Sequence, residues 1–482
     1  VNSDIFSRRT RMTAQIHFLL NDRVVSTHES PGLLVLDYLR HRQRLTGTKE
    51  GCKEGDCGAC TVLIGELVGD SVRYKPVTSC LMPIGELQSK HLVTIEGLNL
   101  PDLTPVQQAI VDEGASQCGF CTPGIVVSLT GLLMQDAASI DRESVKTALS
   151  GHLCRCTGYR SLKAAGDLIG DAVRQRTGVD ALVDDGRLPA WFRAAPAQLQ
   201  ALRDQREAAE RSAEPPSFVI AGGTDLYVQQ GEDVPDRSVD VLNLRPELKG
   251  IERQNGHLRV GALTTFEEFA EHPEVRRQIP EIADYMFLIA SWQIRNRATL
   301  GGNVVNASPI GDMTVLLLAL DSQLVLVAGE RHRTVPMRSF FQGYKVMDKA
   351  PDEILTEILI PVVDSSTRVH WEKVSKRKCL DIATVNSAIR IRTEGDRIED
   401  VSLAVGGVAP IPLRLEATAD SLRGQRLDQA TVEGALAVAQ GEISPISDVR
   451  GSADYKRLLT RQLLIAHFTR LFPDRLAVED LL

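Results

Sequence analysis

Three cysteines fall within nine positions of one glycine-rich stretch, EGCKEGDCGACTV at residues 50–62, and this stretch restricts the possible folds more than any other. The chain has only 9 cysteines in 482 residues, and eight of them lie in its first third. Such a concentration of thiols serves a disulfide knot, a zinc site or an iron–sulfur cluster. The spacing of the cysteines and the rest of the chain help to choose among these three.

The first set of cysteines is Cys52, Cys57, Cys60 and Cys80, in which four and then two residues separate the first three members. This is the spacing of plant-type ferredoxins, and the interleaved glycines allow the tight turns and close N–H groups that an anionic cluster requires. Zinc sites usually show pairs separated by two residues, which this set fits poorly. The sequence therefore predicts a 2Fe–2S cluster held by these four thiolates.

The second set is Cys118 and Cys121, followed after 32 residues by Cys154 and Cys156. We predict each pair just before a helix, where N–H groups and partial positive charge favour thiolates. Taken alone, this spacing is as typical of zinc as of iron–sulfur. The neighbouring ferredoxin-like set favours a second redox centre. The ninth cysteine, Cys379, has no partner in the sequence, and we interpret it as a small apolar residue.

The composition is that of a globular protein without a basic surface. The formal net charge is -8, with 43% apolar and 24% charged residues. Nucleic acids and anionic membranes bind basic surfaces, so we expect neither as a partner. The best apolar run, MTVLLLAL at 313–320, is too short for a membrane span, and we recognise no signal peptide. We therefore expect a cytoplasmic protein, in which thiols stay reduced.

Changes in sequence pattern divide the chain into several domains, as its length requires. Residues 13–90 alternate strand and helix patterns around the cysteine loop, which predicts a small α+β domain. Residues 91–176 contain four helical segments with start signals, which predicts a bundle. Residues 177–213 have no sustained apolar pattern, and we predict a linker there.

The remaining sequence predicts two more domains and a short extension. Residues 214–365 alternate buried-looking strands, glycine turns and apolar helices, which predicts an α/β domain. Residues 366–482 predict a C-terminal α+β domain. Residues 1–12 are expected to be an N-terminal extension, with Met12 as the natural start.

Three motifs, EGCKEGDCGACTV, SQCGFCTPG and GHLCRCTGYR, together resemble the iron–sulfur domains of the molybdenum hydroxylases. This family comprises xanthine dehydrogenases, aldehyde oxidases and carbon monoxide dehydrogenases. The resemblance implies a β-grasp ferredoxin domain followed by a four-helix bundle. It also implies one 2Fe–2S cluster in each domain.

Two further motifs, AGGTDL and TLGGNVVNASPIGD, resemble the FAD domain of the same family, which is of the vanillyl-alcohol oxidase type. Paired glycines permit close backbone approach to a phosphate, and a threonine can donate a hydrogen bond to it. The tail from about residue 369 resembles the small domain that follows the FAD domain. The resemblance implies that FAD contacts the two motifs and a few separate positions, namely Phe218, Val219, Ile220, Ala221, Gly222, Gly223, Thr224, Asp225, Ile289, Thr299, Gly302, Asn303, Asp312, Leu355 and Lys373.

Two places depart from the pattern of vertebrate members of the family. Ile289 stands where those members have an aromatic residue, so the packing against the flavin ring is expected to differ. The loop KRKCLDIA, residues 376–383, differs in charge. The resemblance places this loop close to the flavin and implies a part in the choice between NAD and oxygen as electron acceptor, which stays open here.

No segment of the sequence resembles the large molybdopterin-binding domain of the family. We therefore expect substrate hydroxylation on a second polypeptide and no catalytic residues of that step on this chain. The resemblance is to the small subunit of bacterial xanthine dehydrogenases, and it implies a heterotetramer of two small and two large chains. Electrons would pass from the molybdenum partner through both 2Fe–2S clusters to FAD and then to NAD, while hypoxanthine and xanthine become urate.

Two alternatives remain at this point. The same electron-transfer chain would serve a partner that oxidises an aldehyde or an N-heterocycle such as nicotinate, because the partner alone decides the substrate. A protein of a different class, a redox sensor or carrier without a catalytic partner, would also use these motifs. Association with a molybdenum subunit distinguishes the second alternative from an enzyme.

Overall fold

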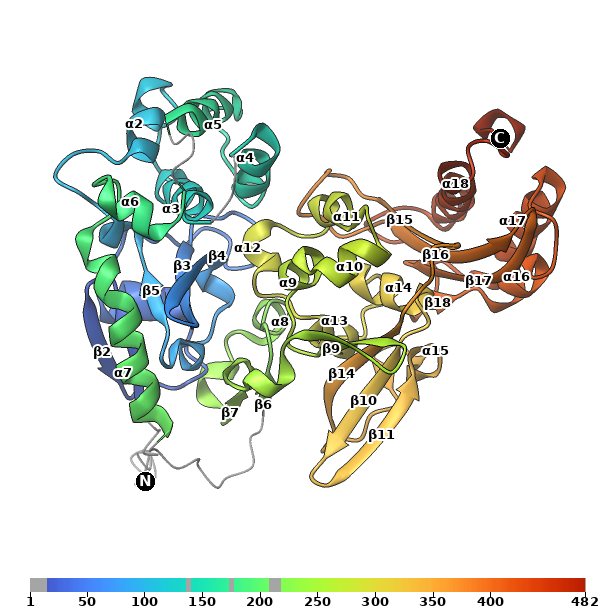
Figure 1. Ribbon diagram of the computed structural model, residues 1–482, viewed down its shortest axis with the longest axis horizontal. Helices are drawn as coiled ribbons and strands as arrows, with labels where there is room; N and C mark the ends of the chain where they lie inside the picture. The colour runs from blue at the N-terminus through green and yellow to red at the C-terminus, as the bar shows by residue number, and fades with distance from the viewer. Residues whose placement is uncertain (1–14, 136–139, 173–176, 208–217, 482) are drawn as a thin grey trace, which may run out of the picture. The chain divides into compact units, whose positions relative to one another are not determined.

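The computed structural model describes residues 15–135, 140–172, 177–207 and 218–481 (Figure 1). The chain forms two compact units. Unit 1 is Val1–Leu244 together with Trp292–Ile294, and unit 2 is Arg245–Ser291 together with Arg295–Leu482. The predicted extension, residues 1–12, and the end of the predicted linker lie outside the described residues.

A five-stranded sheet with the order β2-β1-β5-β3-β4 forms the first part of unit 1. β1 runs parallel to β5, and the other pairs are antiparallel. Alternate residues of the strands, such as Phe18 and Leu20, share a core with Val35 and Leu39 of the helical segment that crosses the sheet. This is the predicted β-grasp ferredoxin fold. Its elements are β1 (Ile16–Leu20), β2 (Arg23–Thr27), α1 (Val35–Asp37), η1 (Tyr38–Arg42), β3 (Thr61–Val68), β4 (Ser71–Thr78), η2 (Ser79–Leu81), η3 (Ile84–Leu87), β5 (His91–Val93) and η4 (Ile95–Leu98).

Four helices follow, as the sequence predicted (Figure 1). The first begins at a capping box made by Thr104 and Gln107, and the third at one made by Asp141 and Ser144. The second helix is buried along almost its whole length, because it packs against β3 of the ferredoxin sheet as well as against its helical neighbours. The helices are α2 (Pro105–Asp112), α3 (Thr122–Leu133), α4 (Arg142–Leu149) and α5 (Arg160–Ala172).

The segment predicted as a linker contains ordered helices that pack on the ferredoxin sheet. Ala195, Leu199 and Leu202 lie on one face of a helix and join Leu19 and Leu67 in a buried cluster. The sequence pattern understated this contact because only these few apolar residues, three to four positions apart, carry it. The elements are α6 (Val179–Asp184), η5 (Ala190–Ala194) and α7 (Ala195–Glu207).

The first flavin motif also belongs to unit 1. Strand β6 pairs in parallel with β7, and a short helix connects them on the way. Ile220 and Tyr227 from this region share an apolar cluster with Cys60 and Cys80. The elements are β6 (Phe218–Ile220), α8 (Leu226–Gln230), η6 (Val234–Asp236), β7 (Val239–Val241) and η7 (Leu242–Leu244).

Unit 2 begins with a five-stranded antiparallel sheet of order β11-β10-β14-β9-β8, and helices pack with it. Helix α14 is apolar around almost its whole circumference, and all of its residues but one are therefore buried. The strands are β8 (Ile251–Gln254), β9 (His257–Gly261), β10 (Gln323–Ala328), β11 (Arg331–Pro336) and β14 (Ile354–Pro361), with a small hairpin of β12 (Phe341–Gly343) and β13 (Val346–Met347). The helices are η8 (Pro246–Leu248), α9 (Phe266–Glu271), α10 (Pro273–Gln278), α11 (Ile282–Leu288), α12 (Trp292–Arg295), α13 (Leu300–Val305), α14 (Asp312–Ala319) and α15 (Met337–Phe340).

A four-stranded antiparallel sheet of order β15-β16-β17-β18 completes unit 2, with helices packed on it (Figure 1). Neighbouring residues of β16 point to opposite faces. Asn386 reaches Asp312 of α14, whereas Ser387 reaches His467 of α18, so these two helices cover opposite faces. The elements are β15 (Thr367–Val374), β16 (Val385–Glu394), β17 (Arg397–Gly406), β18 (Leu413–Arg414), α16 (Glu416–Leu422), α17 (Gln429–Glu442), α18 (Ala453–Leu471) and η9 (Val478–Asp480).

The four predicted fold types are therefore all present: a β-grasp sheet, a helical bundle, a sheet-and-helix region with the flavin motifs, and a C-terminal α+β region. The exact domain boundaries stay predictions. Among the described segments, no helix is both long enough and apolar enough to cross a membrane.

Candidate iron–sulfur and flavin sites

The first cysteine set occupies the loop before β3 and the start of the turn after β4. Its thiols form two hydrogen-bonded pairs, Cys52 with Cys57 and Cys60 with Cys80. Cys60 and Cys80 are buried and the other two are half-buried. A 2Fe–2S cluster takes two thiolates on each of its two irons, and two pairs of sulfurs fit that donor set.

The loop supplies backbone donors to the sulfurs. The N–H groups of Glu54 and Asp56 each donate to Cys52 Sγ over 3.3 Å. The hydrogen bond from the Cys57 thiol, with help from these N–H groups, lowers the pKa of Cys52 to about 5. The same donors would stabilise the negative charge of a bound cluster.

Two glycines make this geometry possible. A Cβ on Gly51 would lie 2.6 Å from the Cys57 sulfur, so only glycine lets the backbone pass there. Gly58 has φ of +70°, in the left-handed region that favours glycine. The loop therefore fits the role that its spacing predicted.

The second cysteine set is also arranged in pairs, each with one sulfur from each half of the motif. Cys118 is hydrogen-bonded with Cys156, and Cys121 with Cys154. Cys121 is the residue directly before α3, as predicted. The second half of the motif lies further from its helix than predicted, because a turn at Tyr159, with φ of +67°, intervenes before α5.

The two sets differ in exposure. Cys118 and Cys156 are exposed, whereas Cys154 is buried. A backbone N–H from Phe120 lowers the pKa of the Cys118 thiol. In the described parts of the chain no three His, Cys, Asp or Glu side chains gather at a point suited to a single metal ion. Both sets present their sulfurs two by two, which is the donor arrangement of a two-iron cluster.

The first flavin motif is a strand, a turn and the start of a helix. Phe218, Val219 and Ile220 form β6, and Asp225 precedes α8. The residues between them, Ala221, Gly222, Gly223 and Thr224, make the turn. This is the arrangement in which successive N–H groups bind a phosphate.

Gly223 sits at the tightest point of this turn. Its φ is +70°, and a Cβ there would lie 3.1 Å from the Leu81 carbonyl oxygen. Because Leu81 follows Cys80, the motif lies next to the first cysteine set within unit 1. The turn of the first flavin motif and the loop of the first cysteine set thus adjoin within unit 1.

The second flavin motif belongs to unit 2 and is held by side-chain hydrogen bonds. Thr299 caps α13 by accepting from the N–H of Gly302 over 3.1 Å. Asn303 Oδ1 accepts from the N–H and the hydroxyl of Thr314 over 3.0 and 2.8 Å. These contacts fix the turn between α13 and α14.

Leu355, another position that the resemblance implies for FAD, lies on β14 and is buried.

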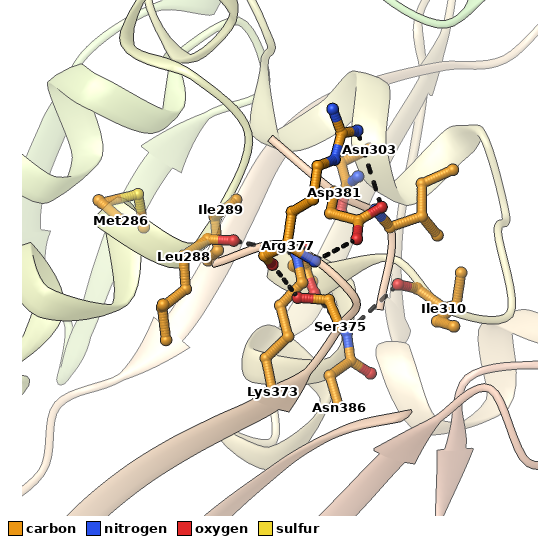
Figure 2. A network of polar contacts seen from close by, with 12 residues as sticks. Met286, Leu288, Ile289, Asn303, Ile310, Lys373, Ser375, Arg377, Asp381 and Asn386 are labelled. Atoms are coloured by element: carbon orange, nitrogen blue, oxygen red, sulfur yellow. Dashed lines mark hydrogen bonds and ion pairs between the residues drawn. The ribbon is translucent and has the colours of Figure 1, made fainter. Parts of the chain in front are cut away.

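Lys373 and Asn386, which Figure 2 shows beside Leu288 and Ile310, both contact the first residue of α14. Lys373 Nζ donates to Asp312 Oδ2 over 2.7 Å and to the Leu288 carbonyl over 3.0 Å. Asn386 Nδ2 donates to Asp312 Oδ1 over 2.6 Å and to the Ile310 carbonyl over 3.2 Å. Two residues predicted from the resemblance, Asp312 and Lys373, are therefore in direct contact.

Ile289 lies at a constrained turn after α11. Its carbonyl accepts from Arg295 over 3.1 Å, and the next residue, Ala290, has φ of +50°. The Ala290 carbonyl accepts from the N–H of Leu380, which belongs to the KRKCLDIA loop. Backbone contacts thus connect the predicted flavin position to that loop.

The carboxylate of Asp381 accepts hydrogen bonds from within the KRKCLDIA loop (Figure 2). Asp381 accepts from the N–H groups of Arg377 and Ile382 over 2.8 and 3.0 Å. Lys378 lies over the Phe287 ring, 5.6 Å from its centroid. Cys379 is half-buried on the same loop. Its predicted role as a small apolar residue stays a prediction.

Sequence reasoning missed two polar residues that support these sites. Asn386 interrupts the apolar strand pattern VNSAIRI, and this interruption was the available signal. Arg295 is 2% exposed and donates to Met286 and Ile289 carbonyls and to Glu267. Nothing in the local pattern distinguishes it from a surface arginine.

Four family models match the chain in succession. Residues 18–84 match the 2Fe-2S iron-sulfur cluster binding domain, and residues 94–167 the 2Fe-2S binding domain. Residues 191–363 match the FAD binding domain in molybdopterin dehydrogenase, and residues 372–471 the CO dehydrogenase flavoprotein C-terminal domain.

Whole-sequence relatives are longer proteins. The xanthine dehydrogenase of Emericella nidulans is 28% identical over 96% of this chain and 39% of its own length. The xanthine dehydrogenase/oxidase of Gallus gallus is 28% identical over 92% of this chain and also 39% of its own length. The chain therefore spans about two-fifths of the length of the curated relatives it matches.

Among solved structures, a carbon monoxide dehydrogenase from Hydrogenophaga pseudoflava is 30% identical, with a TM-score of 0.49, over 51% of this chain and 86% of that chain. The four family models provide the assignment, because together they contain both cysteine sets and both flavin motifs in one order. The chain belongs to the molybdenum hydroxylase family.

Proposed function

We propose that this chain is the electron-transfer part of a xanthine dehydrogenase. Its family consists of oxidoreductases, and the chain carries two 2Fe–2S domains and an FAD-binding domain. The observation that carries the proposal is the arrangement of eight cysteines as two paired sets, the first of them beside a flavin motif. The xanthine dehydrogenases among its relatives support hypoxanthine and xanthine as the substrates.

In this proposal each cysteine set holds one cluster. When bound, the clusters carry single electrons and FAD exchanges electron pairs, which connects a one-electron chain to a two-electron acceptor such as NAD. The paired thiols hold the irons, and the backbone donors around Cys52 stabilise the charge. The ligands are Cys52, Cys57, Cys60 and Cys80 for one cluster, and Cys118, Cys121, Cys154 and Cys156 for the other.

The burial of the two sets supports the direction of electron flow. Cys60 and Cys80 share an apolar cluster with Ile220 of the flavin motif, so the first set is the one beside the flavin. Cys118 and Cys156 are exposed, which suits a site that receives electrons from outside. In the proposed order, electrons therefore reach the cluster of the first set after that of the second set.

Each flavin motif offers candidate FAD contacts within its own unit. The turn from Phe218 to Asp225 offers N–H groups to the pyrophosphate. Thr299, Gly302 and Asn303 define a second fixed turn, and Ile289 and Leu355 supply apolar surface. The Lys373–Asp312 pair places a cation and a carboxylate in fixed positions, where they would orient polar atoms of the flavin.

Oxidation of the substrate is proposed to occur at a molybdopterin centre on a partner subunit. The proposed assembly is a cytoplasmic heterotetramer of two such chains and two partners, with NAD as the acceptor. The relatives named xanthine dehydrogenase support this assignment of activity, and the reduced state of thiols in the cytoplasm suits the cysteine ligands.

Co-purification followed by cofactor analysis tests the proposal. The tagged chain, expressed in a host that makes molybdopterin, should bring down a molybdenum-containing partner, and the complex should contain two 2Fe–2S clusters and one FAD per chain. The complex should form NADH from xanthine. Zinc in place of iron, absence of flavin, or activity confined to an aldehyde or to nicotinate would contradict it.

A further inference from the structure

Three consecutive residues from the sequence between the two flavin motifs pack inside unit 1: Trp292, Gln293 and Ile294. Trp292 joins the apolar core of the helical bundle. Ile294 packs against the apolar cluster that contains Cys60 and Cys80. This triplet therefore contacts both cysteine-bearing domains.

Gln293 is fully buried, and its amide nitrogen has a specific set of partners. Nε2 donates to the Ala148 carbonyl over 2.9 Å and to Ser128 Oγ over 2.8 Å, and lies 3.1 Å from His152 Nε2. Because a carbonyl only accepts, the amide nitrogen must face Ala148. The amide nitrogen shares its two hydrogens among the Ala148 carbonyl, Ser128 Oγ and His152 Nε2. Gln293 thus packs directly against His152 and fixes its place.

His152 lies where the loops of the two cysteine sets meet. A Cβ on Gly58 would lie 2.4 Å from His152 Nδ1, so the imidazole is in close contact with the first loop. The next residue, Leu153, donates its backbone N–H to the Cys57 carbonyl over 3.1 Å. Cys154, a member of the second set, follows directly. The path from Cys57 to Cys154 therefore consists of covalent bonds and one hydrogen bond.

We propose that Gln293 is a positioning residue that holds His152, keeps the Leu153–Cys57 hydrogen bond in place and thereby sets the electronic coupling between the two iron–sulfur centres. The inference rests on the proposed function, because it requires a cluster on each cysteine set. In the step concerned, one electron leaves the centre of the second set, which is oxidised, and reaches the centre of the first, which is reduced. No bond breaks and no proton moves.

A glutamine elsewhere in unit 1 provides a matched control. Gln135 Nε2 donates to the Tyr74 carbonyl over 2.8 Å and to the Gly131 carbonyl over 2.9 Å. It therefore links the bundle to the ferredoxin sheet with two hydrogen bonds, just as Gln293 links its own segment to the bundle. It touches neither cysteine set in its hydrogen bonds. A purely structural effect of losing a glutamine amide should appear in both variants.

The test compares Gln293→Met with Gln135→Met in the complete protein, since methionine keeps the length of the side chain and removes the donors. Three quantities are measured: iron and flavin content, amide hydrogen exchange at Leu153, and the magnetic interaction between the two reduced clusters in EPR spectra. For Gln293→Met we expect full cofactor content, faster exchange at Leu153, and a weaker interaction. Inter-cluster electron transfer after rapid reduction should slow by about tenfold or more, as a displacement near a reacting pair does. Gln135→Met should keep all of these at the wild-type values.

An unchanged EPR interaction and unchanged Leu153 exchange in Gln293→Met would overturn the inference, and so would equal changes in both variants. If Gln293→Met does not fold, hydrogen exchange of the wild-type protein decides: exchange of the Leu153 amide as fast as in an unstructured peptide would also overturn it. If the wild-type protein binds no iron–sulfur cluster, the proposed function fails. The Leu153 exchange then still reports whether Gln293 holds the contact.

Discussion

The ion pair of Lys373 and Asp312 is the most deeply buried charge contact of the flavin region. The Lys373 side chain is 1% exposed and that of Asp312 15%. Replacing Lys373 with methionine would leave the Asp312 carboxylate buried without its cation. We expect Lys373→Met to lower the free energy of unfolding of unit 2 by about 3–5 kcal/mol, measured by urea denaturation of the flavin-free protein.

The double variant Lys373→Met/Asp312→Asn separates the pair from the packing around it. An asparagine carries no charge to desolvate, so the double variant should lose less stability than Lys373→Met alone. A loss below about 1 kcal/mol in the single variant would mean that water or another cation compensates Asp312, as surface pairs behave.

At the scale of elements, helix α18 docks on strands β15 and β16 partly through a chain of polar side chains. His467 Nε2 lies 2.7 Å from Ser387 Oγ, and its Nδ1 lies 2.8 Å from His370 Nδ1. His370 Nε2 faces Glu372 Oε1 at 3.4 Å. With Glu372 ionised, one placement of hydrogens satisfies the whole chain, in which each member donates to the next from the serine to the glutamate.

This row of hydrogen-bonded side chains predicts that unit 2 loses stability in acid. Burial lowers the pKa of His370 to about 4 and also lowers that of His467 well below its ordinary range. Both imidazoles titrate near about 6.5 when unfolded, so between these values the unfolded chain binds more protons than the folded one. Stability is therefore complete above about pH 6.5 and decreases as the pH falls towards 4. The slope should reach about 1.4 kcal/mol per pH unit for each imidazole.

Urea denaturation at a series of pH values measures this slope, and two variants identify its source. His467→Gln should flatten the slope, whereas His332→Gln, at an exposed position on β11, should leave it unchanged. Glu372 acts in the opposite sense, because burial raises the pKa of its carboxyl and the folded state then binds that proton more tightly. An identical slope in His467→Gln would show that other groups control the acid response.

The elements that the sequence predicted well are those coded by local residues. Three of the four helices predicted in residues 91–176 begin at Thr104, Thr122 and Asp141, where the start signal consists of residues within one turn. The helix α7 was interpreted as linker, since its contact with the sheet uses only Ala195, Leu199 and Leu202. A stripe this short becomes significant only when the opposite surface is known.

At the scale of the whole molecule, the candidate sites also contain some residues that the local sequence predicts and others that depend on distant partners. The gathering of the eight cysteines into two sets was predictable, because a loop that holds several thiols close together fixes their spacing. Their role as cluster ligands stays a prediction. Gln293 and Asn386 were not predictable, because their partners lie 74 to 165 residues away in the sequence. The resemblance supplied Asp312 and Lys373 as separate positions, and the structure adds that they form one ion pair.

The proposed order of electron transfer, from the second cysteine set to the first and then to the flavin, can be tested by replacing Cys57, with a replacement of Cys379 as the control. Cys57→Ser removes a ligand from the first set, which adjoins the flavin motif, so the complex should lose the signal of one cluster and form NADH from xanthine much more slowly. Reduction of the second cluster by substrate should persist, since the path to it does not pass through Cys57. Cys379→Ser, on the KRKCLDIA loop, should keep both cluster signals in EPR. Normal NADH formation by Cys57→Ser would mean that electrons reach the flavin without the first set, and the order proposed from the burial of the two sets would be wrong.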